Sequence, residues 1–239
     1  MESYPAPSMR IQRSDTIWLT VTAILTILLW QTPQGRYLLY PFTILGTWFH
    51  EMGHGLMAML LGAEFRSLEI FSNGSGIATH TGKVAFGRFG QALVAAAGPM
   101  GPPIAGAMLL RVSRYGDVAK LVLTLFGLGL IISVVIWVKT VVGVVVISLL
   151  GVVILIIGLQ KASGLQRAAL QFLGVQACIS TFRDFNYLFT AGGSISGQQF
   201  ASDTSVIANH LFLPHWAWGL LLTLFSLTIL FKSLKASTR

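Results

Sequence analysis

The stretch "TWFHEMGHGLMAML", residues 47–60, places two histidines and a glutamate inside an otherwise apolar run. On a helix, His50 and His54 lie on one face, one turn apart, so that both imidazoles can reach a single ion. Glu51 follows the first histidine and is close enough to reach water bound to that ion. This His-Glu-x-x-His pattern is typical of zinc sites in which imidazoles hold the metal and a glutamate takes a proton from water. We therefore predict that His50 and His54 bind zinc and that Glu51 is the catalytic carboxylate.

The composition of the chain is that of a membrane protein. Of its 239 residues, 54% are hydrophobic and only 10% are charged, and the mean hydropathy is +0.74. A soluble domain carries about 25% charged residues. Several apolar runs are long enough to cross a hydrocarbon core of about 30 Å, which takes about 20 helical residues. The candidate runs are residues 16–30, which is short, 41–61, 90–110, 118–138, 140–159, 165–189 and 206–231.

The expected fold is an all-α polytopic membrane protein with six to seven transmembrane helices. We expect a single domain over residues 1–239, with an N-terminal tail over residues 1–15 and no cleavable signal peptide. The last apolar run contains Pro214, which favours a short interfacial helix followed by a span. The basic residues are scattered over loops and ends, where membrane proteins meet anionic lipid. The net charge of +8 therefore gives no reason to expect a nucleic-acid partner, and we predict a multi-pass protein of the cell membrane.

Residues 64–86 depart from the apolar helical pattern. In "EFRSLEIFSNGSGIATHTGKVAF", β-branched and aromatic residues alternate with polar ones around an "SNGSG" turn, which predicts a short β-hairpin after the histidine-bearing helix. Backbone that is not helical is tolerated at membrane depth only where protein or a water-filled cavity covers it. The hairpin is expected either at an interface or lining a cavity, and an ordinary surface hairpin is the alternative.

A hydrolytic zinc site usually has three protein ligands and one open position for water or substrate. Cys178 is the only cysteine, so the missing ligand is a histidine or a carboxylate. His80 lies in the hairpin region, and His210 and His215 lie near the start of the last run, where "PHWAWG" is typical of an aromatic belt at the membrane surface. We therefore expect a carboxylate as the third ligand.

Two aspartates are candidates for this third ligand. Asp184 belongs to a polar stripe at helical spacing that should face the interior of the bundle. The stripe consists of Gln176, Ser180, Asp184 and Tyr187. Asp203 is the alternative, although Asp203 or Ser202 would also serve as a helix N-cap. The stripe favours Asp184.

Several motifs together resemble those of the M50B-like peptidases, relatives of the site-2 intramembrane metalloproteases. The motifs extend over residues 49–219 and read "FHEMGHG", "GSGIATHTG", "AAAGPMGPPIAG", "FRDFNYLF", "SDTSVIA" and "PHWAWG". The resemblance implies that zinc is bound by His50, His54 and a distant aspartate, here Asp184 or Asp203, with Glu51 as the catalytic carboxylate. The aspartate-glycine signature that usually marks the third ligand is absent from this chain, so the resemblance does not choose between the two aspartates.

These observations predict a zinc metalloprotease that cleaves peptide bonds within or beside the bilayer. Its partners would be a membrane protein or peptide substrate and the lipid bilayer, and the hairpin would offer an edge to an extended substrate strand. The alternative is a metal-binding membrane protein without proteolytic activity, either a transporter or an inactive scaffold. Transporters usually place several polar groups on more than one midplane helix, and this chain has few beyond the motif and Asp184.

Overall fold

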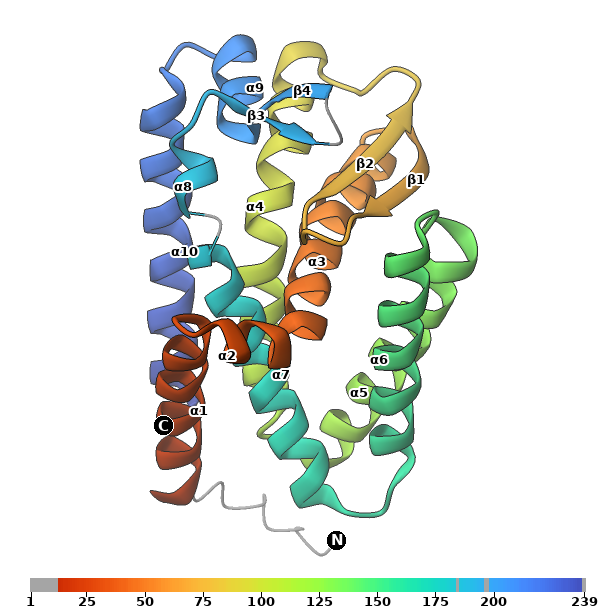
Figure 1. The fold of residues 1–239 in the computed structure, drawn as a ribbon, viewed down its shortest axis with the longest axis vertical. Coiled ribbons are helices and arrows are strands. Elements are labelled where there is room, and N and C mark those ends of the chain that lie inside the picture. Colours follow the sequence, from red (N-terminus) through yellow and green to blue (C-terminus); the bar gives the residue numbers. More distant parts are fainter. Residues whose placement is uncertain (1–12, 184, 196–197, 238–239) are drawn as a thin grey trace, which may run out of the picture.

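The computed structural model describes residues 13–183, 185–195 and 198–237. Helices make up most of this part of the chain, with two antiparallel hairpins between them. In chain order the elements are α1 (Arg13–Trp30), α2 (Pro33–Leu38), α3 (Tyr40–Leu60), β1 (Glu64–Ile70), β2 (Gly76–Thr81), α4 (Gly87–Val112), α5 (Gly116–Ile136), α6 (Val141–Leu159), α7 (Ser163–Arg183), α8 (Phe185–Leu188), β3 (Gly192–Ile195), β4 (Gln198–Ala201), α9 (Asp203–His210) and α10 (His215–Ser237). Figure 1 shows an elongated helical bundle with both hairpins and α9 toward the same end.

The apolar helices make this chain an integral membrane protein. Among the described residues, four helices are long and apolar enough to cross a membrane: α4, α5, α6 and the Leu-rich α10 over His215–Ser233. Ile17–Trp30 of α1 is a shorter apolar helix. Two further predicted spans correspond to α3 and α7, which pack in the same bundle but carry more polar residues. The predicted all-α polytopic membrane fold is confirmed.

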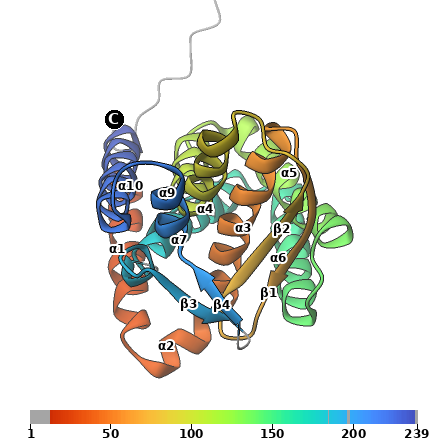
Figure 2. The same cartoon turned by 90° about the horizontal axis from the view of Figure 1, so that it is seen from above.

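The last apolar run is divided near Pro214, as predicted. The short helix α9 ends at His210, and the long helix α10 begins at His215. The carbonyl oxygen of Pro214 accepts a hydrogen bond from the amide of Ala217 at 3.0 Å and so starts the new helix. After this break α10 packs beside α9, and α9 also packs on α4, so that in the view from above the three helices lie next to one another (Figure 2).

The predicted hairpin after α3 is confirmed by β1 and β2. The two strands pair antiparallel from Glu64 opposite Thr81 to Ile70 opposite Gly76. The turn between them is closed by the Phe71 amide, which donates to the carbonyl oxygen of Ser75 at 2.9 Å.

The outer edge of β1 is also bonded. The Leu68 amide donates to the Trp137 carbonyl oxygen at 2.8 Å, and the Lys139 amide donates to the Leu68 carbonyl oxygen at 3.0 Å. The connection between α5 and α6 therefore holds β1 from the other side. Strand β2, on the other side of the hairpin, contributes residues to the lining of the cleft described below.

The second hairpin, β3 and β4, was not expected from the sequence. Its strands are only four residues long and pair from Gly192 opposite Ala201 to Ile195 opposite Gln198. Strands this short leave little alternation to recognise in a sequence. The hairpin leads directly into α9 and so places Asp203 at the end of β4.

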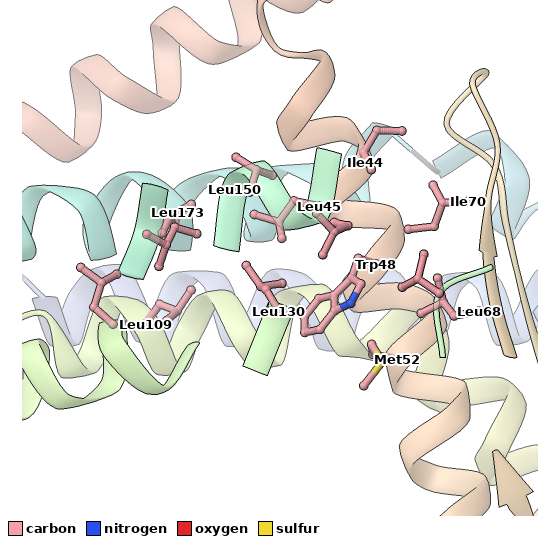
Figure 3. Packing of buried hydrophobic residues seen from close by; sticks show 14 of the residues in the cluster. Ile44, Leu45, Trp48, Met52, Leu68, Ile70, Leu109, Leu130, Leu150 and Leu173 are labelled. Atoms are coloured by element: carbon pink, nitrogen blue, oxygen red, sulfur yellow. The ribbon is translucent and has the colours of Figure 1, made fainter. Parts of the chain in front are cut away.

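One face of α3 is buried in the main hydrophobic core. Figure 3 shows Ile44, Leu45 and Trp48 of this helix among leucines of the neighbouring helices and the β1 residues Leu68 and Ile70. The indole nitrogen of Trp48 also donates to the hydroxyl of a serine in α5, Ser133, at 2.9 Å. Burial of this face fixes the rotation of α3 about its axis, so the motif residues point to the other side.

Helices α3 and α4 approach each other closely because both have glycines at their contact. A Cβ at Gly53 would lie 2.2 Å from the Ala97 carbonyl oxygen, and a Cβ at Gly101 would lie 2.5 Å from the Phe49 carbonyl oxygen. Only glycine permits this backbone contact at either position. The contact brings the middle of α4 directly against the motif histidines.

Candidate metal centre

The motif residues of α3 gather on the side of the helix that faces away from the core. The imidazole rings of His50 and His54 have centroids 4.9 Å apart and meet edge to face. Both side chains are largely buried, with 12% and 13% of their surface exposed, and Glu51 between them in sequence is buried. The helix alone sets this arrangement, because residues four apart lie above one another on the same face.

Asp203 of α9 meets both histidines, although it follows His50 by 153 positions. Its Oδ2 lies 3.0 Å from Nε2 of His50, and its Oδ1 lies 3.2 Å from Nε2 of His54. The carboxylate thus bridges the two ring nitrogens that face the cleft.

Asp203 is free to do this because a neighbouring serine caps α9. The side chain of Ser202 accepts a hydrogen bond from the Ser205 amide at 3.3 Å and donates to the Thr190 carbonyl oxygen at 2.6 Å. Asp203 itself is the first residue of the helix, and its carboxylate makes no capping bond. Of the two capping residues considered from the sequence, Ser202 is the one used.

The second nitrogen of His54 is held by the backbone of α4. Nδ1 lies 2.8 Å from the Val94 carbonyl oxygen, which can only accept, so Nδ1 carries the proton and donates it. In the neutral ring, the lone pair is therefore on Nε2, where it can bind a cation placed between this nitrogen and Asp203. A ring nitrogen fixed in this way by a backbone carbonyl is the usual arrangement of a metal-binding histidine.

The residues present fit a metal ion. One ligand atom each from His50, His54 and Asp203 lies within 4.8 Å of the others. Space beside the ring nitrogens exists because residue 98 of α4 is glycine: a Cβ there would lie 2.1 Å from Nε2 of His54 and 2.8 Å from Nε2 of His50. Two imidazoles and a carboxylate are ligands that zinc accepts.

Glu51 is held against β2 next to this cluster. A Cβ at Gly76 would lie 2.6 Å from Glu51 Cγ and 2.7 Å from its Oε1, so the glycine makes room for the carboxyl group. The backbone of Ala78 hydrogen-bonds the same carboxyl. Glu51 is therefore beside the ligand cluster but is not part of it.

The cluster opens into a cleft of about 230 Å³ between the two hairpins and α4. One wall is β2, and the opposite wall comes from the end of β4 and the start of α9. Its lining consists of His50, Glu51, His54, Gly76, Ile77, Ala78, His80, Gln91, Val94, Ala95, Tyr187, Phe200, Ala201, Asp203 and Val206. A buried carboxyl, a three-residue ligand cluster and an accessible cavity thus share one site.

A family model described as Peptidase M50B-like matches residues 18–233 of the chain. The chain belongs to this family. The match includes every residue that lines the cleft, and it confirms the resemblance drawn from the motifs. No curated protein and no solved structure matches the chain significantly. Membership places this protein among peptidases and their relatives.

The other residues considered as ligands of this M50B-like protein have different positions. Asp184, the favoured third ligand, lies outside the described residues. His80 lines the cleft but is not in the ligand cluster, and His210 and His215 do not line the cleft. Among the described residues, Asp203 is the carboxylate that joins both motif histidines.

Two members of the predicted polar stripe, both in α7, face the interior of the bundle. Gln176 and Ser180 are buried, and the Gln176 amide donates to the hydroxyl of Thr26 in α1 at 2.7 Å. Tyr187, beyond the end of α7, lines the cleft. At Gln176 the stripe therefore links two helices of this M50B-like fold.

Three features of the site were missed in the sequence. They are the wall formed by β4, the Val94 carbonyl that orients His54, and the space left by Gly98. The "GG" and "SG" pairs around residues 192–197 are a turn signal that favours the second hairpin. The roles of Val94 and Gly98 have no local signal, because both depend on how α4 packs on α3.

Proposed function

We propose that this M50B-like protein is an intramembrane zinc metalloprotease that hydrolyses peptide bonds of substrates embedded in or adjacent to the bilayer. The observation that carries the proposal is the meeting of His50, His54 and Asp203 beside the Glu51 carboxyl in one cleft. Metal-assisted hydrolysis needs three such ligands, a carboxylate to handle protons and space for substrate. The apolar helices around the site supply the membrane location.

In this proposal His50, His54 and Asp203 are the zinc ligands. A bound zinc ion polarises a carbonyl oxygen and lowers the pKa of a coordinated water to about 7. The chain contributes by orienting its ligands in advance. The Val94 carbonyl fixes one ring, and the cap made by Ser202 fixes the first turn of α9, from which Asp203 projects.

Glu51 is the proposed general base and, later, general acid. Its carboxylate takes a proton from the attacking water as the water oxygen bonds to the scissile carbonyl carbon and the π electrons move onto the carbonyl oxygen. The same proton then passes to the amide nitrogen as the C–N bond breaks, so the leaving group departs as a neutral amine. A positioned acid-base group of this kind contributes about 10²–10⁴-fold to the rate.

The proposed substrate lies as an extended strand along the outer edge of β2. A helix hides its carbonyl groups in hydrogen bonds, so a membrane helix must unwind locally before cleavage. β1 is bonded on both sides, whereas β2 borders the cleft over Gly76 to His80. Main-chain hydrogen bonds to a strand edge can hold an extended peptide. The expected partners are thus a membrane protein or peptide and the bilayer around it.

Metal content and cleavage in the wild type and in Glu51→Gln test the proposal. Both proteins are purified in detergent, analysed for zinc, and incubated with unfolded casein, whose fragments are identified by mass spectrometry. In parallel, new protein termini are mapped in membranes of cells that produce either protein. We expect both proteins to bind zinc and only the wild type to cleave, in a reaction that a zinc chelator stops.

Two results would contradict the proposal. Cleavage by Glu51→Gln at the wild-type rate would remove the carboxylate from the mechanism. A zinc-loaded wild type that cleaves neither casein nor any membrane protein would favour the alternative, a metal-binding transporter or inactive scaffold.

A further inference from the structure

Strand β2 runs along α3 in the same direction, so that successive residues of β2 lie beside successive turns of α3, up to the turn that carries the candidate metal ligands. The Thr47 hydroxyl donates to the Gly74 carbonyl oxygen at 2.6 Å, and a Cβ at Gly76 would lie 2.6 Å from Glu51 Cγ. Two strand residues advance about 6.6 Å and four helix residues about 6 Å, so the two elements stay in step. His80, four residues after Gly76, is therefore expected beside the part of α3 that follows Glu51.

His80 is the polar side chain that β2 brings to the cleft. Alternate residues of a strand point to the same side, so Gly76, Ala78 and His80 share one face. All three line the cleft, together with Ile77. The first two have no polar side chain, so the imidazole of His80 is the polar group on this face of β2, in the cleft that the candidate ligands of α3 and α9 also line.

The tautomer of His80 follows from its surroundings. Nδ1 is buried and has no hydrogen-bond partner in the described part of the chain. With the proton, Nδ1 is a buried donor without an acceptor; without the proton, it is a buried acceptor without a donor. Both arrangements cost free energy, and unpaired buried donors are the rarer of the two in proteins. Burial lowers the pKa of His80, and nearby His54 lowers it further, so the ring is neutral with one N–H. We therefore place that N–H on Nε2, which is not among the buried unpaired atoms and so is the nitrogen that can meet a ligand.

We propose that His80 donates a hydrogen bond from Nε2 to the carbonyl oxygen of the scissile peptide and stabilises the negative charge that develops there. This inference rests on the proposed function and adds a catalytic residue to it. When water attacks and its proton passes to Glu51, the carbonyl oxygen becomes an oxyanion, while His80 keeps its own proton. When the C–N bond breaks, the carbonyl re-forms and the proton on Glu51 passes to the amine.

Three substitutions separate this donor role from a structural one. His80→Ala removes the donor, His80→Gln places an amide nitrogen near the position of Nε2, and His80→Asn places it near Nδ1. Thr79→Ala, on the exposed opposite face of the strand, controls for folding of the hairpin. His215→Ala controls for loss of a histidine outside the cleft.

Each purified protein is analysed for zinc and assayed with a peptide that contains the cleavage site mapped in casein. The affinity of a phosphinic analogue of that peptide, whose tetrahedral anionic group mimics the oxyanion, is measured by calorimetry. Binding of the uncleaved peptide is measured in a Glu51→Gln background. These readouts distinguish stabilisation of the transition state from binding of the ground state.

For His80→Ala we expect kcat to fall about 10²–10³-fold, which is the loss typical of one oxyanion donor. The Kd of the phosphinic analogue should rise by a similar factor, while zinc content and binding of the uncleaved peptide stay at wild-type values. His80→Asn should behave like His80→Ala, and His80→Gln should retain much more activity and affinity than either. Both controls should match the wild type.

The outcomes separate this inference from the proposed function. If the wild type cleaves the peptide and His80→Ala has the same kcat and analogue affinity, His80 is not a donor and the proposed function stands. Loss of zinc from His80→Ala would also overturn the inference, because it would place His80 in the metal site. If the zinc-loaded wild type neither cleaves nor binds the analogue, the proposed function fails and the role of His80 fails with it.

Discussion

Replacing Gly98 by alanine is expected to abolish metal binding while leaving the fold intact. A Cβ at this position would lie 2.1 Å from Nε2 of His54, 2.3 Å from its Cε1 and 2.8 Å from Nε2 of His50. Non-bonded atoms settle about 3.5 Å apart, so the methyl group overlaps the closer nitrogen by about 1.4 Å. Either the ring moves by more than about 1 Å or α4 moves away from α3.

This displacement is large compared with what a metal site tolerates. Distances between zinc and its ligands are held within about 0.2 Å, so His54 would be lost as a ligand. We expect zinc affinity to fall by more than the roughly 10 to 100-fold that loss of a supporting partner causes. Alanine is about 1 kcal/mol better than glycine within a helix, so helix propensity does not oppose the substitution.

The measurement is zinc affinity by competition with a chelator of known affinity, beside the metal content of the purified protein. Gly129→Ala in α5 is the matched control, because a Cβ there would meet nothing within 4 Å. Circular dichroism and gel filtration verify that both variants fold. Wild-type zinc affinity in Gly98→Ala would refute the placement of the metal beside the two Nε2 atoms.

Other substitutions test individual contacts. In Gly76→Ala, a Cβ would lie 2.7 Å from Glu51 Oε1 and would displace the carboxyl group. Misplacing a reacting group by about 1 Å lowers the rate about 10²-fold, so kcat should fall by this factor without loss of zinc. Unchanged turnover would argue against the role of Glu51 as the acid-base group. Ser202→Ala should lower the free energy of unfolding by about 0.5–2 kcal/mol through loss of the α9 cap, which denaturation measures. Its zinc content should stay at the wild-type value, which metal analysis measures. Trp48→Phe should cost about 0.5–1.5 kcal/mol through loss of the hydrogen bond to Ser133 and should not change zinc affinity; a drop in zinc content would mean that this bond also supports the site.

The helical frame and the two histidines of the candidate metal centre could be predicted because their causes are local. An apolar run of about 20 residues suits a membrane-spanning helix wherever it occurs. The spacing of His50 and His54 places both rings on one helical face without help from the rest of the chain. The β1 and β2 hairpin likewise follows from alternation on both sides of an Asn-Gly turn at residues 73–74.

The choice between Asp184 and Asp203 could not be made from the sequence, because the position of each aspartate depends on the tertiary path. Asp203 reaches His50 across 153 positions, and the intervening helices decide where α9 lies. The polar stripe favoured Asp184, which lies outside the described residues. At Gln176, however, that stripe is accounted for by a buried hydrogen bond to α1, so a polar stripe alone does not identify a ligand.

The central claim is that His50, His54 and Asp203 together bind zinc, and metal stoichiometry in paired aspartate variants tests it most directly. Wild type, Asp203→Ala and Asp184→Ala are purified side by side and analysed by mass spectrometry for zinc. We expect about one zinc ion per chain in the wild type and in Asp184→Ala, and almost none in Asp203→Ala, where two imidazoles remain of the usual three ligands. Zinc retained by Asp203→Ala and lost from Asp184→Ala would contradict the claim.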